Sequence, residues 1–144
     1  MPDVFIAPAD QAPFDVQAVI LEEDTGLILS ADTKIRLVQE HPVRLMTELV
    51  SFEFPAVGET VIQQGNPCFI FAVVIDLDQS PICCRDWVCA ALQQSLELCS
   101  QRQMTHLALQ PLGCRYGQQD PAWFFQELKR QLLSHHFSGI WLIA

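Results

Sequence analysis

The stretch 68–75, CFIFAVVI, constrains the fold of this chain more than any other. An apolar run of this length, rich in β-branched and aromatic residues, is typical of a strand buried on both faces. Such a strand belongs in the middle of a sheet. The turn residues Gly65, Asn66 and Pro67 precede it, and 59–63 then predicts the partner strand of a hairpin.

The rest of the second half alternates between helical and strand patterns. Apolar residues at helical spacing predict a helix over 82–101, and 106–112 and 139–143 read as strands. Asp120 and Pro121 form an N-cap and first-turn pair for a helix that reaches about residue 135. This alternation predicts an α/β fold, a three-layer α/β/α sandwich around a central mixed sheet.

The first half is less regular. Two short β-rich runs, 3–7 and 16–21, are separated by a loop rich in proline and aspartate. Ser30 or Asp32 then caps an expected helix that Pro42 ends or kinks. The 144 residues, of which 50% are hydrophobic and 17% charged, fit one domain spanning 1–144.

The charge balance excludes some partners. A net charge of −9 repels the backbone of double-stranded nucleic acid and anionic membranes. The N-terminus has no basic segment before an apolar one, and no apolar run is long enough to cross a bilayer. We therefore expect a cytoplasmic protein.

The six cysteines suggest neither disulfides nor zinc. They form no C-x-x-C pair and no recognised ligand spacing with the histidines. We expect reduced cysteines that pack as small hydrophobic side chains.

The stretch 108–129, ALQPLGCRYGQQDPAWFFQELK, places Gly113 and Gly117 between a strand and a helix N-terminus. A loop at this place either cradles an anion with its backbone N–H groups or simply turns the chain. In mixed and parallel sheets, ligands bind beyond the carboxyl ends of the strands, where this loop is expected.

This strand, loop and helix, with the helix and hairpin before them, resemble the macro domain over roughly 55–144. The likeness is greatest to the branch that includes the terminal ADP-ribose glycohydrolases, in which P-x-I-G-C-G embraces the diphosphate of ADP-ribose. The resemblance implies that Leu112, Gly113, Cys114, Arg115, Tyr116 and Gly117 bind this diphosphate. It also implies that Asp10 contacts the adenine amine, and it implies no cofactor.

The chain departs from the family in two loops. The strand 16–21 runs into LEEDTG, with Gly26 alone, where many macro domains have Asn-Ala-Ala-Asn and a glycine-rich loop. Gly117 stands where the resembling branch has its catalytic aspartate, and Asp120 comes three residues later. No catalytic residue is therefore assigned, and little hydrolysis of ADP-ribosyl bonds is expected. Arg115 replaces a glycine, and its side chain either pairs with a phosphate or fills the ligand's space.

Three carboxylates, Glu22, Glu23 and Asp24, follow the second strand at the expected ligand edge. They would disfavour a diphosphate unless a metal ion bridges them or the side chains point away. We interpret them as a solvated acidic turn in preference to a metal site.

Three functions compete. The first is a macro-like domain that binds ADP-ribose or a related nucleotide. The second is a degenerate macro fold that acts as an interaction or oligomerisation module, including a homo-oligomer, with its ligand site filled. The third, a metal-dependent hydrolase that uses the acidic turn, has no histidine motif to support it.

Overall fold

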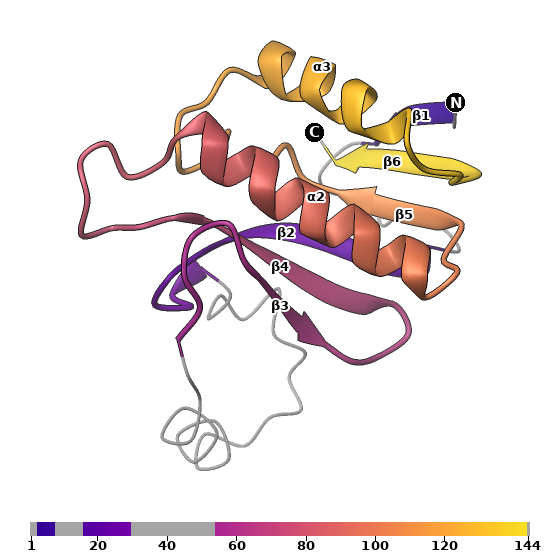
Figure 1. Ribbon diagram of the computed structural model, residues 1–144, viewed down its shortest axis with the longest axis horizontal. Coiled ribbons are helices and arrows are strands. Elements are labelled where there is room, and N and C mark those ends of the chain that lie inside the picture. Colours follow the sequence, from indigo (N-terminus) through magenta and orange to yellow (C-terminus); the bar gives the residue numbers. More distant parts are fainter. Residues whose placement is uncertain (1–2, 8–15, 30–53, 144) are drawn as a thin grey trace.

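Residues 3–7, 16–29 and 54–143 are described by the computed structural model of the chain (Figure 1). They form a six-stranded sheet in the order β1-β6-β5-β2-β4-β3. Only β3 is antiparallel to its neighbour, and all other pairs are parallel. The predicted mixed sheet and α/β fold class are confirmed.

The strands and helices lie close to their predicted positions. The strands are β1 (Asp3–Ala7), β2 (Ala18–Asp24), β3 (Thr60–Gln63), β4 (Cys68–Ile75), β5 (His106–Leu109) and β6 (Gly139–Ile143). The helices are α2 (Arg85–Gln101) and α3 (Pro121–Leu132). The helix expected after Ser30 or Asp32, with its end or kink at Pro42, falls on residues outside the described ones.

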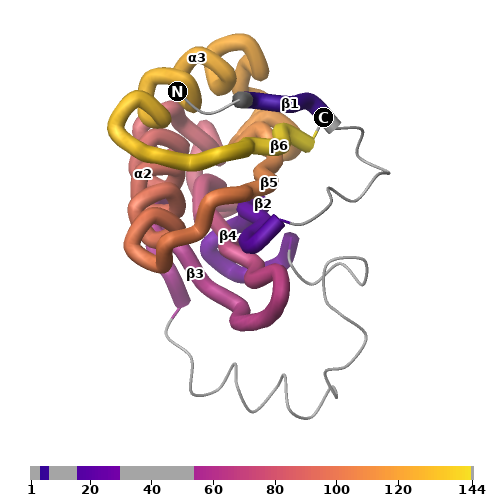
Figure 2. Tube along the Cα trace, turned by 90° about the vertical axis from the view of Figure 1, so that its right-hand side faces the viewer, coloured from indigo at the N-terminus to yellow at the C-terminus, as the bar shows by residue number. Residues whose placement is uncertain are grey.

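Strand β4 lies between β2 and β3, as its apolar sequence requires. All of its residues except Phe69 are buried. Both helices cover the same face of the sheet, as the turned view in Figure 2 shows. Their buried residues include Leu92 and Leu96 of α2 and Phe124 and Leu128 of α3. These side chains and the helix-facing residues of the sheet make one core.

Several element boundaries differ from those predicted. Strand β2 spans Ala18–Asp24 and not 16–21, because its pairing with β4 continues to Asp24. Helix α2 starts at Arg85 and not at residue 82, because Cys83 forms an isolated bridge with Ile75 and Cys84 is still extended. Strand β5 ends at Leu109 and not at 112, since its pairing with β2 ends at Ile20. Helix α3 ends at Leu132 and not near 135.

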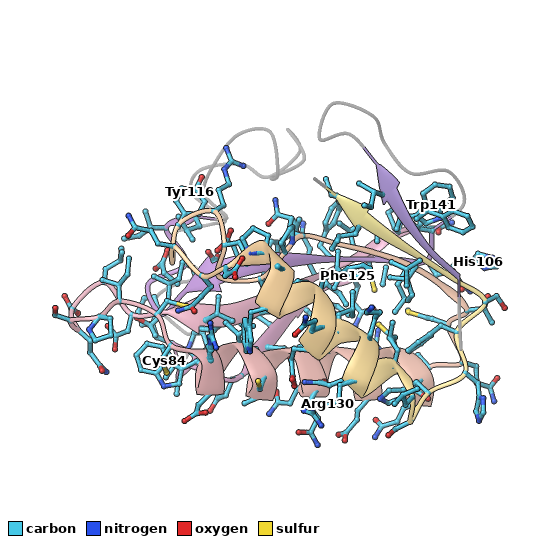
Figure 3. The ribbon with its side chains drawn as sticks, turned by 90° about the horizontal axis from the view of Figure 1, so that it is seen from above. Cys84, His106, Tyr116, Phe125, Arg130 and Trp141 are labelled. Carbon is cyan, nitrogen blue, oxygen red and sulfur yellow. The ribbon has the colours of Figure 1, made fainter. Side chains whose placement is uncertain are left out.

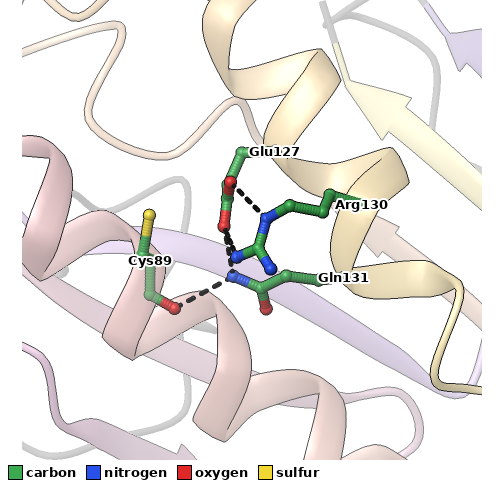
Figure 4. Close-up of polar contacts among 4 residues, drawn as sticks. All are labelled: Cys89, Glu127, Arg130 and Gln131. Carbon is green, nitrogen blue, oxygen red and sulfur yellow. Dashed lines mark hydrogen bonds and ion pairs between the residues drawn. The ribbon is translucent and has the colours of Figure 1, made fainter.

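Polar contacts join α3 to α2 (Figure 4). The Gln131 side chain donates to the Cys89 carbonyl at 3.1 Å and to the Glu127 carboxylate at 3.0 Å. Arg130 pairs with the same carboxylate, and this contact lowers the pKa of Glu127 to about 2. The Gln131–Cys89 contact ties α3 to α2, and the contacts of Glu127 stabilise α3 itself.

All six cysteines are free. Cys68, Cys83 and Cys99 are buried, and Cys84, Cys89 and Cys114 are partly exposed. Burial raises the pKa of the Cys99 thiol to about 12. Among the described helices, none has the length and apolar character needed to cross a membrane.

Candidate functional site

The loop between β5 and α3 closes on itself just beyond the sheet. Gly113 takes a left-handed conformation with φ +77°, and its carbonyl accepts a hydrogen bond from Gln119 N–H at 3.0 Å. Cys114 N–H donates to the Pro111 carbonyl at 3.1 Å. Tyr116 lies at the tip of this loop, away from the helices (Figure 3).

Close packing explains both glycines of the loop. A Cβ at Gly113 would lie 2.9 Å from Val88 Cγ2 and 3.0 Å from Cys83 Sγ. A Cβ at Gly117 would lie 2.6 Å from both Cys83 Cβ and the Gly113 carbonyl oxygen. The glycines therefore let the loop rest on Cys83, which holds its backbone against the start of α2.

Replacing Gly117 with alanine is expected to lower the free energy of unfolding by about 2 kcal/mol, because overpacking typically costs about 1–3 kcal/mol. Urea denaturation measures this loss. Gly139→Ala is the control, since its Cβ would approach the side chain of the exposed His106, 3.2 Å away, which can move. Equal losses in the two variants would show that the contact with Cys83 is unimportant.

The three carboxylates at the end of β2 are buried, so the prediction of a solvated acidic turn is wrong. Glu22, Glu23 and Asp24 are 4%, 0% and 1% exposed. Asp24 accepts hydrogen bonds from Gly26 N–H at 2.7 Å and from Ile28 and Leu29 N–H at 3.0 Å. Its carboxylate thereby fixes the first loop, which the sequence alone leaves without a recognisable pattern.

The Glu22 carboxylate faces the second loop. The backbone N–H groups of Gly113, Arg115 and Tyr116, here called the amide cradle, lie near enough to lower its pKa. Neither carboxylate oxygen has a hydrogen-bond partner, so these amides lie outside hydrogen-bonding geometry. Burial outweighs their effect and that of the Arg115 charge, and raises the pKa of Glu22 to about 7.

The remaining loop residues have identifiable roles. The Arg115 guanidinium lies over the Tyr116 ring, 5.2 Å from its centroid, and both side chains are exposed. Asp120 caps α3 by accepting from Ala122 N–H at 3.0 Å, a contact typically worth about 1 kcal/mol. Burial raises the pKa of the Cys114 thiol to about 11, which disfavours the thiolate that a nucleophile needs.

The structure brings together Leu112 to Gly117 and the acidic residues of β2, but Asp10 lies outside the described residues. Two residues that the sequence did not indicate support the site. Cys83 packs against Gly113 and Gly117 of the loop. The Gln110 side-chain oxygen accepts a hydrogen bond from Glu22 N–H at 3.2 Å. Within the described ranges, no group of three or more histidine, cysteine or acidic residues is arranged to hold a metal ion.

Comparison with known proteins identifies the fold. No family model matches the sequence, and no curated protein does. Solved structures do match. The macrodomain of Thermus aquaticus DarG has a TM-score of 0.71 at 12% identity, with 99% of each chain covered.

The chain has the macrodomain fold. A macrodomain from Oceanobacillus iheyensis with MES bound gives a TM-score of 0.72 at 14% identity, over 96% of this chain and 81% of that one. The DarG macrodomain of Mycobacterium tuberculosis gives 0.68 at 13% identity, over 100% and 99%. The likeness to the terminal ADP-ribose glycohydrolase branch of macrodomains stays a prediction.

Proposed function

We propose that this macrodomain binds ADP-ribose or a related nucleotide diphosphate through the loop 112–117. The observation that carries the proposal is the amide cradle at the carboxyl ends of the parallel strands β2 and β5, where open sheets bind ligands. Solved structures of the same fold include an Oceanobacillus iheyensis macrodomain with ADP bound and a mutant with ADP-ribose bound.

The residues that hold the ligand in this proposal are Leu112 to Gly117, with Asp10 toward the adenine. Backbone N–H groups are suited to a diphosphate because they offer several donors without a counter-charge. Arg115 is exposed and free to add a charge-assisted bond, and its neighbour Tyr116 offers a ring for stacking on the ribose.

Hydrolysis is not part of the proposal. Gly117 occupies the place of the catalytic aspartate, and Asp120 caps α3 with its side chain. We expect little release of ADP-ribose from modified protein or nucleic acid. The protein is proposed to reside in the cytoplasm as a binding domain.

Isothermal titration calorimetry with ADP-ribose tests the binding. We expect a Kd in the micromolar range or weaker, about 8 kcal/mol of binding free energy or less. Arg115→Ala should weaken binding about tenfold, as the loss of one charge-assisted hydrogen bond does. Arg102→Ala is the matched control, since it removes the same charge at the far end of α2. Tighter binding by Arg115→Ala would show that Arg115 blocks the site.

One observation favours the second candidate, an interaction module without nucleotide binding. The Glu22 and Asp24 carboxylates already face the backbone amides of both loops, so the ligand site is partly filled by the chain itself. Absence of any heat with ADP-ribose, combined with self-association in analytical ultracentrifugation, would favour this function, including a homo-oligomer.

A further inference from the structure

Glu22 is the buried ionisable group that the proposed function leaves unexplained. Its side chain is 4% exposed, it faces the amide cradle, and neither of its oxygens has a hydrogen-bond partner. A buried carboxylate is usually stabilised by hydrogen bonds or by an ion pair. The arrangement therefore resembles an anion site whose occupant fits poorly.

We infer that Glu22 determines when a diphosphate binds this loop: the ligand enters the amide cradle only with the Glu22 carboxyl protonated. This inference rests on the proposed function and concerns the same site. As a carboxylate, Glu22 is the resident anion of the cradle and repels a phosphate. As a carboxylic acid it is neutral and has an O–H that joins the amides as a donor to a phosphate oxygen.

The surroundings of Glu22 make both states accessible. The Arg115 charge acts on it and favours the carboxylate, and that side chain is exposed. Cys83 and Cys114 face it from the start of α2 and from the loop, and the pKa of each thiol is raised to about 11, so both stay neutral. On its own strand, the Glu23 carboxylate accepts from Asp24 N–H, and Asp24 accepts from the first loop. Glu22 therefore titrates at about 7, the pKa that burial gives it.

This pKa determines the direction in which the affinity for the ligand changes with pH. Below pH of about 7 the carboxyl is protonated and the cradle accepts an anion, so binding is tightest there. Above this pH, Glu22 must take up a proton for each ligand that binds, and the affinity falls by up to tenfold per pH unit. Between pH of roughly 6 and 8 the loss is about tenfold. ADP-ribose keeps its charge over this range, whereas a phosphate monoester titrates near 6 and would confuse the result.

The experiment is calorimetry of ADP-ribose with the wild-type chain and with Glu22→Gln at about pH 6 and 8, in buffers of different ionisation enthalpy. The wild type should bind about tenfold more weakly at the higher pH and take up nearly one proton per ligand there. Glu22→Gln, which is neutral at every pH, should bind equally at both and take up none. Glu97→Gln removes the same charge from the exposed face of α2 and should behave as the wild type.

The possible results distinguish a failure of the inference from a failure of the proposed function. Wild-type binding that is independent of pH and takes up no proton overturns the inference and leaves the proposed function standing. Failure of the wild type and Glu22→Gln to bind at either pH overturns the proposed function, and the inference with it. Equal binding by Glu22→Gln at both pH values, with weaker wild-type binding and proton uptake at about pH 8, supports the inference. The proton uptake of the wild type decides the question even if the variant does not fold.

Discussion

Truncating Phe124 to alanine is expected to lower the free energy of unfolding by about 3–5 kcal/mol, the typical cost of removing a buried aromatic ring. Phe124 is 0% exposed and belongs to the core between α3 and the sheet. The loss combines the hydrophobic transfer of the ring with the cavity that it leaves, because a well-packed core collapses only in part.

Phe125 provides a matched control on the same helix. Its ring is partly exposed, and Lys129 Nζ lies over it, 4.8 Å from the ring centroid. Phe125→Ala is expected to lower the free energy of unfolding by about 1 kcal/mol, because folding buries a smaller apolar area of this ring. Urea denaturation of both variants measures the difference. Equal losses would mean that α3 does not pack on the sheet through Phe124, and the position of the following loop would then be wrong.

The second large effect concerns the pH dependence of stability. Burial raises the pKa of Glu22 from 4.5 to about 7, so the folded state binds a proton more tightly than the unfolded state. The stability that this provides is fully present below pH of about 4.5 and is lost as the pH rises to about 7. The loss amounts to roughly 3 kcal/mol at 1.36 kcal/mol per pKa unit.

Urea midpoints of the wild type and Glu22→Gln between pH of about 4.5 and 8 test this effect. The wild type should lose stability relative to the variant as the pH rises, and the difference should level off above about 7. Glu127 does not interfere, because its pKa is lowered and the stability it provides is lost only as the pH falls below about 4.5. Parallel curves for the two proteins would show that Glu22 is not buried in the folded state.

The sequence predicts those parts of the fold that depend on local pattern. The apolar run of β4 is buried only if the strand lies between two others. Asp120 and Pro121 mark the start of α3 by their local chemistry alone. The start of α2 was misplaced because Cys83 pairs with Ile75, a contact that no local pattern specifies.

The site was predicted only in part for the same reason. Gly113 and Gly117 mark a loop, but their close contact with Cys83 comes from another part of the chain. Glu22 looks like a solvated residue in LEED, and it is buried because the loop after β5 folds over it. The burial of a carboxyl group by a loop that lies far along the chain is not visible in a single sequence.

Nuclear magnetic resonance of the ¹⁵N-labelled chain during titration with ADP-ribose, at about pH 6, tests the central claim that the loop 112–117 is a diphosphate site. The account predicts that the backbone amide signals of Gly113, Arg115 and Tyr116 shift most and saturate together. Signals from the far end of α2, near Arg102, should stay in place. Shifts confined to other regions, or no shift at millimolar ADP-ribose, would contradict the account.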